Sequence, residues 1–148
     1  MSDGNHLVEM ESLFLALADK TRLRILNLMR EDEVCVCFFT EVLGESQPKI
    51  SRHLAYLRNA GLVSARREGK WMNYQIEFPK NSFAAGLLEN TLRWLKMQDD
   101  MREDYEKLAE FCCAVEVPVT ISRAPTPKAF AQTNMSRQPK EELDTFLL

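Results

Sequence analysis

The chain has 148 residues and a formal net charge of −3, with 45% hydrophobic and 28% charged residues. This length and composition predict one soluble domain with a modest core. No run of about 20 apolar residues could cross a bilayer, and no basic and apolar leader marks a signal peptide. We therefore expect a cytoplasmic protein without a membrane partner, whose four cysteines are reduced thiols available as metal ligands or redox groups.

Apolar residues at helical spacing predict helices over residues 7–18 and 20–29, with Asp19 as the N-cap of the second. A further pair of helices is expected over residues 37–43 and from 47 to about 60. Gly44 ends the first of this pair, and Ser46 followed by Pro48 begins the second. This pattern is typical of a helix-turn-helix, whose second helix enters the DNA major groove. An ordinary helical hairpin with a solvated outer face is the alternative.

The second helix of this pair has one apolar stripe, formed by Ile50, Leu54 and Leu57. The polar and basic residues around the stripe are our candidate DNA contacts: Gln47, Lys49, Ser51, Arg52 and His53. Residues 47–72 carry six Lys and Arg against one Glu, whereas residues 99–116 carry seven Asp and Glu against two Lys and Arg. A basic half and an acidic half suit a protein that meets phosphate on one side only.

Two strands are predicted after this helix, over residues 62–67 and 71–76, joined by a turn at residues 68–70. Such a ribbon is the wing of a winged helix-turn-helix. Arg66, Arg67 and Lys70 are placed at its tip, where we expect contacts to phosphate or to the minor groove.

One long helix is expected from about residue 82 to residue 114, about 45–50 Å long at 1.5 Å per residue. Its seam alternates steps of four and three at Leu87, Thr91, Trp94, Gln98, Met101, Tyr105, Leu108 and Cys112. A helix of this length needs a partner, so we predict a homodimer through the terminal helices. The DNA-binding and dimerisation domain is then residues 1–116. Prolines and polar residues over 117–148 predict a mostly disordered C-terminal tail.

The cysteines form two pairs. Cys35 and Cys37 lie at a helix start, where the helix dipole favours the thiolate, and Cys112 and Cys113 lie near the end of the long helix, with Cys112 on the seam. Thiolates select soft ions. We hypothesise a site with Cys35, Cys37 and at least one of the other two, from the same or the partner protomer. Simple packing of buried thiols is the alternative.

The sequence gives little support for a histidine-based metal site or for an enzyme active site. His6 and His53 are the only histidines, which disfavours a zinc or nickel site. No base lies near the cysteines in the sequence, and no Gly-rich phosphate loop is present. We therefore do not expect an enzyme. A thiol enzyme would show turnover, and a pure interaction module would show no salt-dependent DNA binding.

Four segments together resemble the ArsR/SmtB family of metal-responsive repressors. They are residues 18–26 (opening signature), 33–37 (metal box), 46–54 (recognition helix) and 67–71 (wing). The resemblance covers about residues 13–78 and is nearest to the arsenite and antimonite sensors. It implies a mainly α, homodimeric winged helix-turn-helix with a two-stranded wing. It also implies that the apo form represses an operon and that the metal-bound form releases the DNA.

One position departs from this resemblance. Arsenite sensors of this type often have a third cysteine one turn after the Cys-x-Cys pair, and this chain has Thr40 there. As(III) prefers three thiolates, so Cys112 and Cys113 are the candidate source of the third. We predict a repressor that binds operator DNA as a dimer and is released by As(III) or Sb(III), without a catalytic cofactor. A Cd(II)- or Pb(II)-sensing repressor and a thiol redox-switched repressor remain alternatives.

Overall fold

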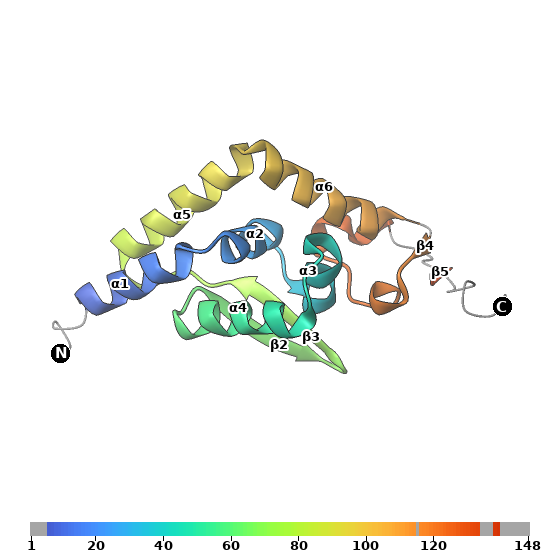
Figure 1. Cartoon of the computed structure of the whole chain (residues 1–148), viewed down its shortest axis with the longest axis horizontal. Helices are drawn as coiled ribbons and strands as arrows, with labels where there is room; N and C mark the ends of the chain where they lie inside the picture. Colours follow the sequence, from blue (N-terminus) through green and yellow to red (C-terminus); the bar gives the residue numbers. More distant parts are fainter. Residues whose placement is uncertain (1–5, 115, 134–137, 140–148) are drawn as a thin grey trace.

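The computed structural model describes residues 6–114, 116–133 and 138–139. Two helices, α5 and α6, form an inverted V over α2 and α3, and α4 lies with the β2–β3 ribbon on the opposite side (Figure 1). The helices are α1 (His6–Leu17), α2 (Lys20–Met29), α3 (Val36–Leu43), α4 (Gln47–Asn59), α5 (Ser82–Met97) and α6 (Asp99–Cys113). The strands are β1 (Val34–Cys35), β2 (Val63–Glu68), β3 (Trp71–Ile76), β4 (Glu116–Val117) and β5 (Gln138–Pro139), and the short 3-10 helices are η2 (Val119–Ile121) and η3 (Lys128–Thr133).

The helix-turn-helix is formed by α3 and α4, and capping residues set its boundaries. Gly44 ends α3 in the left-handed conformation, with φ 66°, which glycine adopts without a Cβ clash. The Ser46 hydroxyl accepts a hydrogen bond from the Lys49 amide at 3.4 Å and begins α4. The inward face of α4 is fully buried, at Ile50, Leu54 and Leu57. The predicted helix pair and its apolar stripe are confirmed.

A third strand extends the predicted two-stranded wing. The sheet order is β1-β3-β2, and β1 pairs antiparallel with β3 so that Cys35 lies opposite Asn73. The sequence pattern predicts β2 and β3 but not β1, because a strand of two residues has no alternating pattern to recognise. The consequence is that Cys35 belongs to the same sheet as the wing.

The long C-terminal helix that we predicted as one piece is two helices. Gln98, between α5 and α6, has an extended backbone with φ −80° and ψ 139°, and the first turn of α6 holds Asp99 and Asp100, which favour a helix N-terminus. After this bend, α6 folds back on its own core. Met101, Leu108 and Cys112 are only 6%, 1% and 0% exposed.

The predicted dimer seam is therefore wrong along α6. Its apolar residues pack inside their own protomer, and a spacing of three and four does not distinguish a partner helix from a protein's own core. An ion pair holds α6 in place: Arg24 on α2 donates two hydrogen bonds to Asp104, at 2.7 and 2.9 Å. Because Asp104 is only 5% exposed, its charge needs such a partner.

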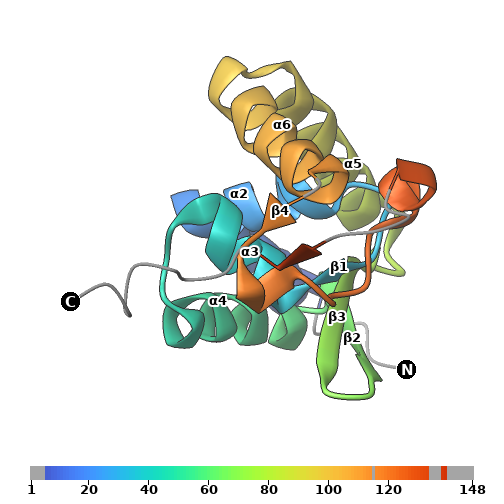
Figure 2. The same ribbon diagram turned by 90° about the vertical axis from the view of Figure 1, so that its right-hand side faces the viewer.

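The segment after α6 packs against the domain instead of leaving it. Val117 and Ile121 are 0% exposed and Ala124 is 5% exposed, and the rings of Phe130 and Tyr105 are 5.8 Å apart. Figure 2 shows this segment beside α3. The prediction of a disordered tail is thus wrong for residues 117–133. Apolar side chains scattered along this segment pack into the core. The other parts of this predicted tail, residues 134–137 and 140–148, lie outside the described residues.

Among the helices described, none combines the length and apolar character that a membrane-spanning helix needs.

Candidate DNA interface and thiol pair

The outward face of α4 carries part of the predicted DNA-contact set. Gln47, Ser51 and Arg52 are exposed on this face. Lys49 is partly buried, and its ammonium group lies 3.0 Å from the Glu45 carboxylate in the preceding turn. In a helix that enters the major groove, the residues near the N-terminus contact the base edges. The exposed donors of α4 lie at this end of the helix.

His53 differs from these residues because it contacts other helices. Its Nδ1 lies 3.3 Å from the Arg22 guanidinium and 3.8 Å from the Asp19 carboxylate. The Arg22 guanidinium also stacks over the Tyr56 ring at 4.1 Å and donates to the Leu15 carbonyl at 2.9 Å. This cluster ties α4 to α2 and to the end of α1, so in this structure His53 orients the helix. The contacts of Arg22 could not be predicted from the sequence, because no local spacing links residues on different helices.

The predicted wing cations fall into two groups. Arg67 and Lys70 are exposed near the turn between β2 and β3, and the Lys70 ammonium lies 4.9 Å from the Trp71 ring centre. Arg66 instead forms a two-pronged ion pair with Glu33, with its Nη2 2.6 Å from Oε1 and its Nε 3.0 Å from Oε2. Arg66 therefore anchors the wing to the turn before β1. Its partner was not foreseen from the sequence.

Cys35 and Cys37 form a close thiol pair. The Cys37 thiol donates a hydrogen bond to the Cys35 sulfur at 3.1 Å. Cys35 is 0% exposed in β1, and Cys37 is partly exposed in the first turn of α3. The hydrogen bond from Cys37 lowers the pKa of Cys35, and the same bond, together with burial, raises the pKa of Cys37. When the pair loses a proton, the first thiolate therefore forms at Cys35.

The second thiol pair is not gathered with the first. Within the described residues, no group of three His, Cys, Asp or Glu side chains is placed to hold a metal ion. Cys112 is buried in its own protomer and Cys113 is exposed, so our expectation that Cys112 faces a partner subunit is wrong. At the position where a third cysteine would stand, the Thr40 hydroxyl donates to the Cys37 carbonyl at 2.7 Å.

Comparison with known proteins agrees with this architecture. Residues 19–65 match the model of a family described as bacterial regulatory protein, arsR family. The arsenical resistance operon repressor of Escherichia coli is 41% identical over 103 residues, which are 69% of this chain and 86% of that protein. The arsenic resistance transcriptional regulator ArsR1 of Pseudomonas putida is 43% identical over 100 residues, 62% of this chain and 78% of that protein.

A solved structure supports the fold. The homodimeric winged helix-turn-helix DNA-binding domain Mb0332 of Mycobacterium bovis superposes with a TM-score of 0.52 at 28% identity, over 68% of this chain and 93% of that one. The fold is thus a winged helix-turn-helix, and the chain belongs to the arsR family of bacterial regulatory proteins.

Proposed function

We propose that this protein is a dimeric transcriptional repressor that binds operator DNA through α4 and the wing. In this proposal, it releases the DNA when As(III) or Sb(III) binds the thiolates of Cys35 and Cys37. The observation that carries the proposal is the position of the thiol pair, with sulfurs 3.1 Å apart. Cys37 lies on the first helix of the helix-turn-helix, and Cys35 lies on a strand paired with the wing. The relatives named as arsenic-resistance repressors support arsenic as the inducer.

The geometry indicates how ion binding would disturb the DNA-binding surface. Two thiolates on one ion with bonds of about 2.3 Å, as in zinc sites, lie about 3.5–3.8 Å apart, so the sulfurs must separate slightly from 3.1 Å. Cys35 is fixed in the core at 0% exposure, so the movement falls on Cys37 and α3. Because α3 packs on α4, the shift reaches the DNA-reading helix. Ion and operator are then coupled through two conformations.

We propose Cys113 as the third ligand. It is the exposed member of its pair, whereas Cys112 is 0% exposed and would have to leave the core. The helices α3 and α6 pack against each other, and in this proposal ion binding brings the end of α6 to Cys37 within one protomer. An ion held by Cys35, Cys37 and Cys113 would satisfy the three-thiolate preference of As(III).

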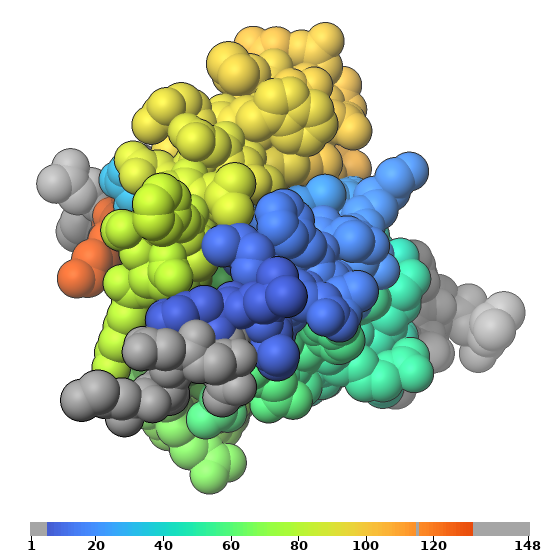
Figure 3. All heavy atoms as spheres, turned by 90° about the vertical axis from the view of Figure 1, so that its left-hand side faces the viewer, coloured from blue at the N-terminus to red at the C-terminus, as the bar shows by residue number. Residues whose placement is uncertain are grey.

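The dimer is proposed to form through α1 and the outer face of α5. These helices expose large apolar side chains, namely Leu7 (81%), Phe14 (54%), Phe83 (79%), Trp94 (53%) and Met97 (63%). Figure 3 shows α1 in blue and α5 in yellow-green side by side on one face of the molecule. An apolar surface of this kind marks an association site, and the homodimeric relative supports a second copy of the chain as its occupant.

The test is Cys37→Ser, measured by fluorescence anisotropy on a labelled fragment of the DNA upstream of the protein's own gene. We expect the variant to bind this DNA within about threefold of the wild type and to stay bound when arsenite is added. Thr40→Ser, on the same helix and with its hydroxyl kept, is the matched control and should release normally. Release of Cys37→Ser at the arsenite concentration that releases the wild type would contradict the proposal.

The same assay separates the alternatives. Release of the DNA by cadmium or lead at a lower concentration than arsenite would favour the Cd(II)- or Pb(II)-sensing repressor. Release by peroxide in metal-free buffer would favour the redox reading. Under our proposal, arsenite releases the DNA at a lower concentration than the other agents. The absorption band of the arsenic–thiolate bonds then reports three sulfurs per ion.

A further inference from the structure

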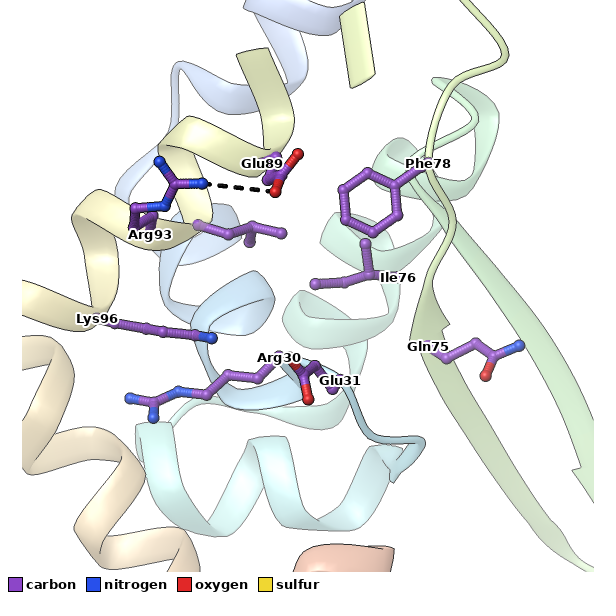
Figure 4. Close-up of a pocket in the computed structure, with 9 residues that line it drawn as sticks. Arg30, Glu31, Gln75, Ile76, Phe78, Glu89, Arg93 and Lys96 are labelled. Atoms are coloured by element: carbon purple, nitrogen blue, oxygen red, sulfur yellow. Dashed lines mark hydrogen bonds and ion pairs between the residues drawn. The ribbon is translucent and has the colours of Figure 1, made fainter. Parts of the chain in front are cut away.

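A cavity of about 360 Å³ lies between the end of α2, the end of β3 and one face of α5. It does not include the thiols or the exposed face of α4. Its volume falls in the lower range of small-molecule sites, which measure about 300–1,000 Å³. Figure 4 shows its lining: Ile76 and Phe78 on one side, and Arg93, Lys96 and Arg30 on the other.

Among the described residues, two of the cations in this cavity have no acidic partner. Arg93 is paired with Glu89 at 3.5 Å. In the part of the chain that the structure describes, neither Arg30 nor Lys96 has a carboxylate oxygen within 4.0 Å of its charged nitrogens. Although Glu31 also lines the cavity, it does not reach either group. Two positive charges that line one cavity without a counter-ion favour the binding of an anion.

Arg30 is held in place by the protein. Its guanidinium stacks on the Tyr105 ring at 3.6 Å, and its Nε donates to the Asn27 carbonyl at 3.3 Å. Its backbone has φ 47°, and it is the one described residue other than glycine with a positive φ. Strained backbone of this kind is retained where the surroundings require a particular side-chain position. Burial lowers the pKa of Arg30, so an anion beside it would offset a desolvation cost.

Part of the cavity lining is apolar. Ile76 comes from the end of β3, Phe78 follows it, and Leu92 comes from α5. An inorganic ion would leave this surface unused, whereas a neutral apolar molecule would leave the two cations unpaired. We propose that this cavity binds a small organic anion with an apolar body, such as an arylalkyl or medium-chain carboxylate, with the carboxylate at Arg30 and Lys96.

Such a ligand would act on DNA binding independently of the thiols. It would contact both the wing strand β3 and α5, the helix of the proposed dimer surface, and would fix one relative position of the two. A change in wing position changes the fit to DNA. The cavity would thus be a second effector site, whose occupancy does not depend on Cys35 or Cys37.

The experiment is calorimetric titration of the full chain with phenylacetate and with octanoate, without DNA or arsenite. For ligands of this size we expect a dissociation constant between about 10 µM and 1 mM. Lys96→Gln should weaken binding by about tenfold or more, and Lys107→Gln, an exposed lysine on α6 outside the cavity, should bind as the wild type. Phenylacetamide, which lacks the charge, and acetate, which lacks the apolar body, should bind at least tenfold more weakly.

Three outcomes would overturn this inference: no binding of either carboxylate at 10 mM, equal weakening by both lysine variants, or equal binding of acetate and phenylacetate. Thermal melting of Lys96→Gln verifies that the variant is folded. Because the titration contains neither DNA nor arsenite, its failure leaves the proposed repressor function untouched, and failure of arsenite release leaves this site untouched.

Discussion

Thr40 and Cys37 lie one turn apart on α3, with the Thr40 hydroxyl 2.7 Å from the Cys37 carbonyl. Residues spaced by three share a helix face, so a cysteine at position 40 would place a third sulfur beside the existing pair. We predict that arsenite releases Thr40→Cys from DNA at a concentration at least about tenfold lower than the concentration that releases the wild type. The measurement is anisotropy during arsenite titration, with Thr40→Ser as the control.

The same variant tests the origin of the third ligand. In the wild type, Cys113→Ser should impair release by arsenite, whereas in the Thr40→Cys background it should have little effect. If Thr40→Cys depends on Cys113 as strongly as the wild type does, the sulfur at position 40 is not a ligand.

The ion pair of Arg66 with Glu33 gives a pH-dependent contribution to stability. The hydrogen bonds from Arg66 lower the pKa of Glu33 from its ordinary value of 4.5. A carboxylate with a lowered pKa stabilises the folded state above its ordinary pKa, and this contribution is lost as the pH falls through the lower, folded-state value. We predict that Arg66→Gln reduces the urea midpoint at pH 7, with a difference from the wild type that shrinks between about pH 5 and pH 3.

Arg93→Gln, in the exposed pair with Glu89 (side-chain exposures 66% and 65%), is the matched control, because exposed pairs contribute little. A difference between Arg66→Gln and wild type that stays constant down to pH 3 would show that Glu33 is not the group responsible.

At this scale, the sequence was informative where residues that lie together in the structure are also close in the chain. The Cys35–Cys37 pair and the exposed donors of α4 were predicted from neighbouring positions. By contrast, the Arg66–Glu33 pair joins residues 33 positions apart. The burial of Cys112 depends on a bend at Gln98. Neither contact leaves a local pattern, because both are products of tertiary packing.

Among the elements, the C-terminal segment makes a contribution to stability that can be measured. Ile121 in η2 is 0% exposed, and truncation of a buried isoleucine to alanine costs about 2–4 kcal/mol. We predict that Ile121→Ala lowers the free energy of unfolding by this amount in urea denaturation. Val119→Ala, two residues away at 60% exposure, should change it by less than about 0.5 kcal/mol. Equal effects would mean that the segment does not pack as described.

Element boundaries were predictable where a capping residue marks them. Asp19 begins α2 by accepting the Arg22 amide, and Gly44 and Ser46 set the turn between α3 and α4. The boundary between α5 and α6 at Gln98 has neither a proline nor a glycine that would indicate the end of a helix. Only the two aspartates that follow it hint at a new N-terminus, and the gain from packing α6 on α2 and α3 decides the outcome.

For the whole molecule, the proposed DNA complex predicts a steep dependence on salt. Arg67 is exposed on the wing, and in a dimer its loss removes two phosphate contacts. We predict that Arg67→Gln lowers the slope of log K against log salt concentration by about two. Lys107→Gln, on the distant helix α6, should leave the slope unchanged. A slope unaffected by Arg67→Gln would place the wing away from the phosphates.

The charge distribution explains why a chain with net charge −3 can bind DNA. Its basic part, residues 47–72, forms α4 and the wing, and its acidic part, residues 99–116, forms mostly α6 on the opposite side (Figure 1). This separation was predictable from the sequence. The position of the proposed dimer surface was not, because it depends on which face of α5 remains exposed once α6 has folded back.

The bend at Gln98 affects how subunits can exchange between dimers. Since α6 completes the core of its own chain, separated subunits would keep their tertiary structure, and two differently tagged preparations should exchange partners on simple mixing. Hybrids carrying one intact and one Cys37→Ser chain could then be purified. Their response to arsenite would reveal how many occupied sites are enough to free the operator.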